Sequence, residues 1–228
     1  MAIFNPMTGV GGLGAMKRND GQTDVFLQLN PGETVIVSTS GQNFTGDVYA
    51  YYQEVGESIP VSGNWTVSFV QGGPQLPAPI TVDSLASWTG FAGDEYKAFS
   101  GTAVYTTTID KVPVADVIKL DLGSVAENAS VYLNGDYIGT VIDSPYQLYI
   151  PAEKFKGQDE LVVRVANSMA NRIAYMDKKE MDWKIFYNIN MSARKKENVK
   201  NGIFDASNWE PKPSGLLGPV MLIPVVVK

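Results

Sequence analysis

Histidine and cysteine are both absent from this chain of 228 residues. Because histidine is absent, the chain lacks the commonest general base and the commonest metal ligand of proteins. Catalytic triads of the Ser–His–Asp type are therefore excluded. Without cysteine, disulfides, thiol nucleophiles and zinc–thiolate sites are excluded as well. Carboxylates, lysine, tyrosine and serine remain for any chemistry.

Basic charge and long apolar runs are also scarce. The net charge is −6 and the sequence pI is about 4.7, which argues against nucleic acid as the main partner. The one basic run, "ARKKENVK" at 193–200, is interrupted by Glu197 and predicts a solvated loop. No stretch approaches the roughly 20 apolar residues of a membrane span. The first 14 residues lack the pattern of a signal peptide, so export cannot be read from them.

Short runs of alternating apolar and polar residues fill most of the chain. They are bounded by Gly, Pro, Asn or Asp, and helical periodicity is almost absent, which predicts an all-β antiparallel sandwich. The buried positions expected from the alternation are Trp65, Tyr105, Leu120, Val131, Leu133, Leu161 and Val163. The runs cover residues 24–30, 33–40, 64–70, 102–109, 117–123, 129–135, 137–142, 146–151, 160–167, 185–192 and 218–227.

The stretch "VYLNGDYIGT" at 131–140 predicts a tight hairpin. Asn134–Gly135 fits a type I′ turn, in which both central residues need positive φ. Val131 and Leu133 are expected on one face of the strand, with Ser130 and Tyr132 on the other. In the second strand, the missing side chain of Gly139 predicts a bulge or the close approach of another backbone.

The chain is expected to divide near residues 57–63. Residues 1–57 form a Gly-rich approach and two strands, which cannot bury a core alone. This segment either packs on the downstream domain or is the remnant of a preceding β-sandwich. Residues 58–228 are long enough for one complete sandwich, whose first strand is expected near Ser62.

Two motifs could carry chemistry. Gly9, Gly11 and Gly14 match G-x-G-x-x-G, but dinucleotide binding also needs a preceding strand and a following helix, so a flexible connector is the preferred interpretation. Glycoside hydrolysis uses two carboxylates held across a cleft. The three acids within "YMDKKEMDWKIFY" (175–187) are instead interpreted as an exposed loop or a short helical turn, with catalysis as the minor alternative.

Aromatic residues near predicted strand ends indicate a sugar-binding site. Sugar rings stack on aromatic faces, while their hydroxyls and carboxylates seek amide and guanidinium donors. The same tryptophans could instead pin their loops to the core, with an arginine holding a neighbouring carboxylate. For Trp88 too, both ligand contact and packing against the core are possible interpretations. The candidate ligand-binding loop residues are Asn171, Arg172, Trp183 and Trp209.

Several motifs together resemble a known family. "GNWTVSF", "FSGTAVYTTTI", "LDLGSVAENASVYLNGDYIGT" and "ELVVRVANSMANRI" occur in the order of the galactose-binding-like, sugar-binding-type jelly roll of family 2 β-glycosidases. With the ending "FDASNWEPKPSGLLGPVMLIP", the chain is most similar to the C-terminal part of the α-L-rhamnosidases of glycoside hydrolase family 106, common in gut Bacteroidetes. The resemblance covers nearly the whole chain. It implies a jelly-roll β-sandwich of galactose-binding-like type, preceded by a short β segment.

The resemblance also implies a function. In that family the catalytic carboxylates belong to an upstream barrel, which nothing here matches, so we expect no catalytic residue and a non-catalytic accessory domain with weak glycan binding. A purely structural module that supports a catalytic domain, or a small glycoside hydrolase, are the alternatives. The expected partner is a plant-type glycan or that catalytic domain, in a periplasmic or secreted location. The resemblance allows a structural calcium ion, although no position here matches its ligands.

Overall fold

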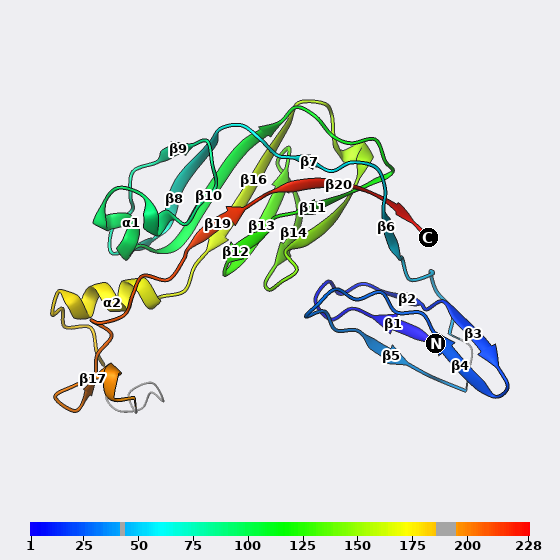
Figure 1. The fold of residues 1–228 in the computed structure, drawn as a ribbon, viewed down its shortest axis with the longest axis horizontal. Coiled ribbons are helices and arrows are strands. Elements are labelled where there is room, and N and C mark those ends of the chain that lie inside the picture. The colour runs from blue at the N-terminus through cyan, green and yellow to red at the C-terminus, as the bar shows by residue number, and fades with distance from the viewer. Residues whose placement is uncertain (42–43, 186–194) are drawn as a thin grey trace.

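The computed structural model describes residues 1–41, 44–185 and 195–228. Its largest element is a six-stranded antiparallel sheet with the order β14-β13-β16-β10-β8-β9 (Figure 1). The strands are β8 (Trp65–Gly73), β9 (Ile80–Val82), β10 (Ser100–Ile109), β13 (Asn128–Leu133), β14 (Asp136–Val141) and β16 (Asp159–Ala166).

A five-stranded sheet packs against the first, in the order β15-β11-β20-β6, with β7 also paired to β20. Two short helices, α1 (Asp94–Ala98) and α2 (Ala170–Lys178), lie at one end of this sandwich. The predicted all-β class, an antiparallel sandwich with a short β segment before it, is confirmed. The strands of the second sheet are β6 (Tyr52–Glu54), β7 (Ile59–Pro60), β11 (Val117–Asp121), β15 (Gln147–Pro151) and β20 (Met221–Val227), and a separate pair joins β12 (Ser124–Ala126) to β19 (Gly215–Gly218).

The core lies between the two sheets and follows the alternation of the strands. In β13 the burial alternates strictly, with Val131 and Leu133 buried and Ser130 and Tyr132 more exposed, as predicted. Edge-to-face contacts join Phe69, Trp88 and Phe99 within the core. Trp88 is fully buried, so the packing interpretation holds for it. All seven predicted core residues are at most 2% exposed: Trp65, Tyr105, Leu120, Val131, Leu133, Leu161 and Val163.

The predicted hairpin is confirmed. Asn134 and Gly135 have φ of 53° and 85°, the positive values that the turn requires. The Asn134 side chain also donates to the buried Asp159 carboxylate (2.6 Å). The pairing shifts register between Val131 and Tyr132, so Ile138 forms a bulge directly beside Gly139, as expected. A Cβ on Gly139 would lie 2.8 Å from the Leu148 side chain, so a side chain rather than a backbone approaches there.

The N-terminal segment contains more strands than the sequence predicted. Gly11 and Gly12 belong to a strand rather than a flexible connector, and a Cβ on Gly12 would lie 2.6 Å from the Tyr49 nitrogen. Three strands form the sheet β2-β1-β5 and two more form a hairpin. They are β1 (Ala2–Phe4), β2 (Gly11–Leu13), β3 (Met16–Asn19), β4 (Gln22–Val25) and β5 (Ile36–Ser38).

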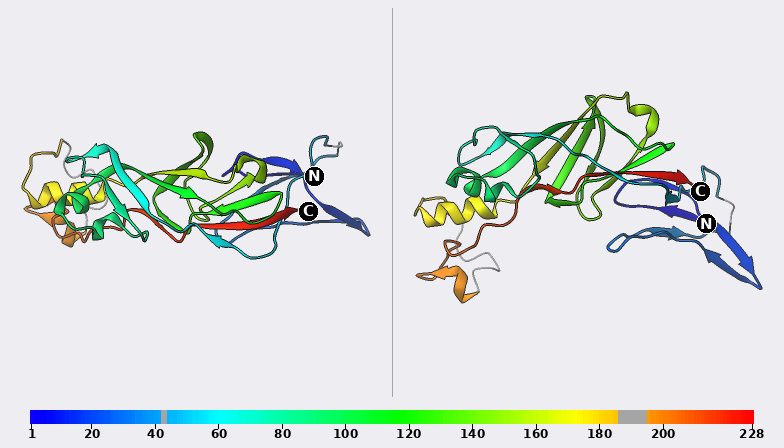
Figure 2. Two further views of the ribbon diagram at one scale, coloured as in Figure 1. Left: turned by 90° about the horizontal axis from the view of Figure 1, so that it is seen from above. Right: turned by 45° about the horizontal axis from the view of Figure 1, so that its top comes forward.

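This N-terminal segment is joined to the sandwich through β6. Tyr52 of β6 stacks on Tyr149 of β15, with ring centroids 3.8 Å apart, and the Tyr52 amide donates to the Gln28 side chain. Glu54 of β6 forms an ion pair with the buried Lys119 of β11. Two further views show the N-terminal strands and α2 at opposite ends of the long axis (Figure 2).

The largest correction concerns Asn171 and Arg172, which were expected in a loop, because residues 170–178 form α2. Asn171 and Arg172 therefore lie on a helix. The last turn of α2 agrees with the short helical turn that was one interpretation of residues 175–187. The basic run continues into a 3-10 turn at Lys196–Asn198 and the short strand β17 (Val199–Lys200), which pairs with β18 (Ile203–Phe204). The predicted strand at 185–192 falls almost entirely on residues outside the described part of the chain.

Candidate functional site

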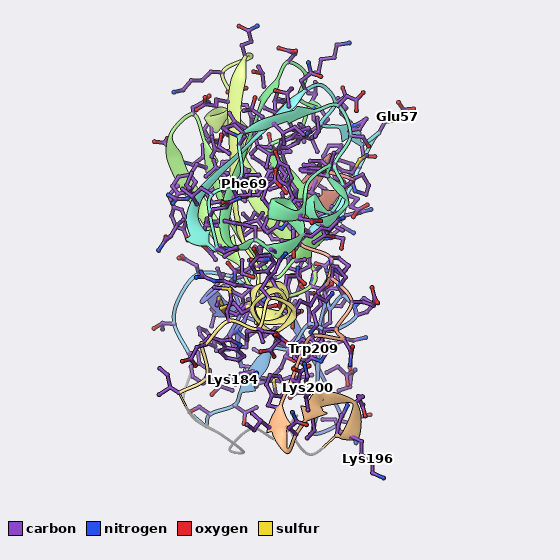
Figure 3. All side chains as sticks on the ribbon, turned by 90° about the vertical axis from the view of Figure 1, so that its left-hand side faces the viewer. Glu57, Phe69, Lys184, Lys196, Lys200 and Trp209 are labelled. Carbon is purple, nitrogen blue, oxygen red and sulfur yellow. The ribbon has the colours of Figure 1, made fainter. Side chains whose placement is uncertain are left out.

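Helix α2 organises the end of the sandwich where the sequence placed its candidate site. Its buried residues are Asn171, Ala174 and Asp177, spaced three apart, so one narrow face of the helix is fixed against the rest of the chain. This face carries two polar side chains, and each must find partners because it is buried. Figure 3 looks along α2, with Phe69 in the sandwich on one side and Trp209, Lys184 and Lys200 on the other.

Asn171 uses its amide to hold the segment that leads into β19. Its nitrogen donates to the Lys212 carbonyl (2.9 Å) and to the Ser214 hydroxyl (3.1 Å), and its oxygen accepts from the Lys212 amide (2.8 Å). Both N–H donors are therefore occupied, and the residue is only 5% exposed. This geometry makes Asn171 a clamp between α2 and the C-terminal segment.

Asp177, near the end of α2, is the centre of a second cluster of hydrogen-bonded side chains. Its carboxylate accepts from the Trp183 indole (2.7 Å), the Lys184 ammonium (2.6 Å) and the Ala206 amide (2.7 Å). Because its side chain is only 1% exposed, the expectation of an exposed acid is wrong for Asp177. The cluster fixes the segment after α2 and the turn near Ala206 to the same helix.

The other two acids of this stretch point elsewhere. Glu180 has a φ of 52°, is exposed and lies 3.5 Å from Lys200, while Asp182 is exposed. Asp177 already accepts three hydrogen bonds, so the three carboxylates do not face one another across a cleft. Within the described residues, no three His, Cys, Asp or Glu side chains group together as metal ligands.

Trp209 lies on the loop after β18. Its indole donates to Asn198 (2.9 Å), and its ring meets Phe204 edge-to-face at 5.7 Å. Nearby, a hydrogen bond from the Ser207 hydroxyl holds the pKa of Asp205 below its usual value. Trp209 nevertheless keeps one side open, since it lines a groove between α1 and α2.

This groove has a volume of about 290 Å³. Its walls combine two aromatic rings with several charged groups, and the cations exceed the acids, although the chain as a whole has a net charge of −6. Lys97 pairs with Asp94 (3.5 Å) and Lys179 lies 5.9 Å from the centre of the Tyr175 ring. The sequence did not reveal this groove, because the groove depends on α2. Its lining includes Asp94, Lys97, Tyr175, Lys178, Lys179 and Trp209.

Arg172 occupies a different position on α2. Its backbone amide donates to the Ser100 hydroxyl (3.2 Å), and its guanidinium lies against Gly73 at the end of β8. A Cβ on Gly73 would lie 2.3 Å from Nη1, so only glycine leaves room for the guanidinium there. Of the four predicted site residues, the structure brings Asn171 and Trp209 to the groove, whereas Trp183 belongs to the Asp177 cluster and Arg172 to the β8 side. Their role in ligand binding stays a prediction.

A second surface lies at the opposite end, on the N-terminal strands. Ten of the 21 large apolar side chains that are exposed in the described part of the chain fall between residues 1 and 48. Phe4 and Ile36 are cross-strand partners and are 42% and 53% exposed. In the sheet β2-β1-β5, the strand β5 is an edge. Clustered apolar exposure of this kind is typical of a surface that packs on another protein surface.

The comparisons with known proteins give related results. No family model matches the chain. A rhamnosidase from Novosphingobium sp. PP1Y matches in structure with a TM-score of 0.72 and 26% identity, over 97% of this chain and 20% of that one. A putative beta-glucuronidase from Formosa agariphila is 29% identical over an alignment of 223 residues, and the match covers 89% of this chain and 19% of that one. The chain thus spans about a fifth of the length of either relative, and it resembles one part of a glycoside hydrolase. Among the residues that the structure describes, no helix has the length and apolarity to span a membrane.

Proposed function

We propose that this chain is a non-catalytic accessory β-sandwich of a rhamnosidase-like glycoside hydrolase. In this proposal residues 58–228 form the accessory domain together with the strand β6, and the rest of residues 1–57 connects it to a neighbouring domain. The observation that carries the proposal is the extent of the structural match, which takes in 97% of this chain but only 20% of the rhamnosidase. A likeness confined to one part of a long enzyme supports an accessory role rather than the whole activity.

The carboxylates near α2 support the same proposal. A glycosidase of the common type needs two carboxyl groups on either side of the scissile bond, about 5–9.5 Å apart. Asp177 is held by three donors, and Glu180 and Asp182 are exposed on a different turn. An acid that already accepts three hydrogen bonds is a poor proton donor, so Asp177 acts as a structural group.

The proposal also includes weak glycan binding in the groove between α1 and α2. Trp209 and Tyr175 offer aromatic faces, and Lys97 and Lys178 offer donors for hydroxyls. An open groove removes little of a sugar from water, so the dissociation constant should be on the order of 0.1–1 mM.

A purely structural role is the second candidate, and the apolar N-terminal surface favours it. Phe4, Ile36 and Val37 are between 39% and 53% exposed, and β5 is an edge strand in the described sheet. Such a surface is suited to packing against another domain of a hydrolase, with β5 extended by a further strand. Under this role, glycan titrations should be silent while the N-terminal surface still binds the hydrophobic dye ANS. The variant Val37→Thr should then bind less dye.

Turnover measurements test the accessory role. The purified chain is incubated with p-nitrophenyl α-L-rhamnoside and with p-nitrophenyl β-glucuronide, the sugars for which the two relatives are named. We expect no release of nitrophenol above the buffer blank. Turnover that is lost in Glu180→Gln or Asp182→Asn would overturn the proposal, because those are the exposed acids of the cluster.

A further inference from the structure

Arg172 is a half-buried cation for which this chain supplies no counter-ion. No ion pair among the described residues includes it, and its Nε is buried without a hydrogen-bond partner. Residues 186–194, outside the described part, contain no aspartate or glutamate. The sequence-based alternative, in which Arg172 holds a neighbouring carboxylate of this chain, is therefore wrong.

The guanidinium of Arg172 lies against the end of β8. Gly73 leaves the space that the guanidinium occupies, since a Cβ there would lie 2.3 Å from Nη1 and 2.7 Å from Cζ. The backbone of Arg172 is tied to β10 through the Ser100 hydroxyl. A planar guanidinium is suited to bind a carboxylate through two parallel hydrogen bonds.

The surroundings of Arg172 on α2 favour an anion. Between residues 170 and 179 the sole acid is Asp177, which is buried and paired with Lys184, whereas Lys178 and Lys179 add positive charge. Tyr175 lies one helical turn from Arg172, and Lys179 lies one turn further along the same side. Tyr175 and Lys179 also line the groove, whereas Arg172 lies outside the groove lining, one turn from Tyr175 and next to the end of β8. Along α2, the Tyr175 ring therefore stands between two cations.

We propose that Arg172 binds the carboxylate of an acidic sugar, so that the glycan site on α2 prefers uronic-acid residues over neutral ones. The sugar ring packs on Tyr175, and its carboxylate accepts from the guanidinium. This inference rests on the proposed glycan binding and adds the class of sugar. It assigns to Arg172 a planar, two-pronged contact with a carboxylate that the lysines lining the groove do not supply.

The test compares two trisaccharides that differ only at C6 of each sugar unit, where one has a carboxylate and the other a hydroxymethyl group. Trigalacturonic acid and galactotriose, both α-1,4-linked, are titrated against the full chain at one ionic strength, by NMR chemical-shift changes. We expect the acidic trimer to bind about tenfold more tightly, as for other charge-assisted hydrogen bonds. The methyl ester of the acidic trimer keeps its size and loses its charge, so it should bind as weakly as galactotriose.

Variants then locate the effect. Arg172→Gln should reduce affinity for the acidic trimer to that for galactotriose, and Arg172→Lys should lose part of the preference because it keeps charge without the planar fork. Arg164→Gln removes the same charge from an exposed position on β16 and should change nothing. Circular dichroism checks the folding of each variant.

The outcomes separate the two proposals. Equal binding of the acidic trimer, its ester and the neutral trimer by the wild type would overturn the role of Arg172 and leave glycan binding intact. A preference that Arg172→Gln keeps would also overturn it. Binding of none of the three sugars would overturn both. The comparison of the acid with its ester uses the wild-type protein, so it stands even if a variant does not fold.

Discussion

Replacement of Asp177 by asparagine should release the segment after α2 from the sandwich. The carboxylate accepts hydrogen bonds of 2.6–2.7 Å from Trp183, Lys184 and the Ala206 amide, with 1% of its side chain exposed. Asparagine keeps the shape but turns an NH₂ group toward at least one of these donors. It also leaves Lys184 without its counter-ion.

The magnitude follows from the burial of the pair. Removal of one partner of a buried ion pair costs about 3–5 kcal/mol. Because the Lys184 side chain is 20% exposed and can regain some water, we take the lower end, about 3 kcal/mol. If the loss is confined to this segment, the Ala206 amide should exchange with deuterium about a hundredfold faster.

Amide hydrogen exchange of Ala206 in wild type and Asp177→Asn measures this effect directly. Asp182→Asn is the matched control, because it removes the same charge from an exposed position five residues away and should alter stability by less than about 0.5 kcal/mol. Exchange of Ala206 in Asp177→Asn within threefold of wild type would refute the structural role of the cluster.

Three further predictions concern the sandwich. Leu133→Ala should lower the free energy of unfolding by about 2–5 kcal/mol in urea, since Leu133 is 2% exposed, and a loss below about 1 kcal/mol would contradict its burial. Gly135→Val should lower the melting temperature because Gly135 has a φ of 85°, and an unchanged value would show another turn. Burial raises the pKa of Tyr149 to about 12 and raises that of Tyr105 too, so their stabilising contribution is complete below about pH 10 and is lost as pH rises through about 12. Urea unfolding between pH 9 and 12 should show this decline, reduced in Tyr149→Phe, and a flat profile would count against it.

The sandwich core could be predicted because strand alternation is a local signal. In β13 and β16 every second side chain faces the core, so the pattern of apolar residues gives both the strand and its buried face. The turn at Asn134–Gly135 is local as well, since its residue types follow from the φ values that it needs.

Helix α2 could not be predicted in the same way. Its sequence "ANRIAYMDK" buries two polar residues, Asn171 and Asp177, so its inner face does not show an apolar stripe. Asn171 bonds to groups 41 and 43 residues further along the chain. Asp177 bonds to the Ala206 amide, 29 residues further along, as well as to the nearer Trp183 and Lys184. These long-range contacts override the weak local pattern, and the groove beside α2 depends on them.

In the N-terminal segment, the sequence predicted longer strands than the structure contains. The stretches at 24–30 and 33–40 alternate as longer strands would, but the described strands cover only Gln22–Val25 and Ile36–Ser38. Phe26, Leu27 and Leu29 are 42–57% exposed just after β4. The sequence thus contains strand signals that continue past the end of β4, where the backbone of Phe26 bonds to Ala15 and Tyr51 and no described strand continues. Our proposal of a neighbouring hydrolase domain accounts for them.

The most direct test of an accessory role is an experiment that detects binding and cleavage in one sample. The purified chain is mixed with rhamnose-containing pectin oligosaccharides, and saturation-transfer NMR is followed by a time course of the anomeric proton signals. Our account predicts saturation transfer to the oligosaccharide, weakened in Trp209→Ala, with no new anomeric signal over a day. New reducing-end signals that grow with wild type and stop growing in Glu180→Gln or Asp182→Asn would contradict it.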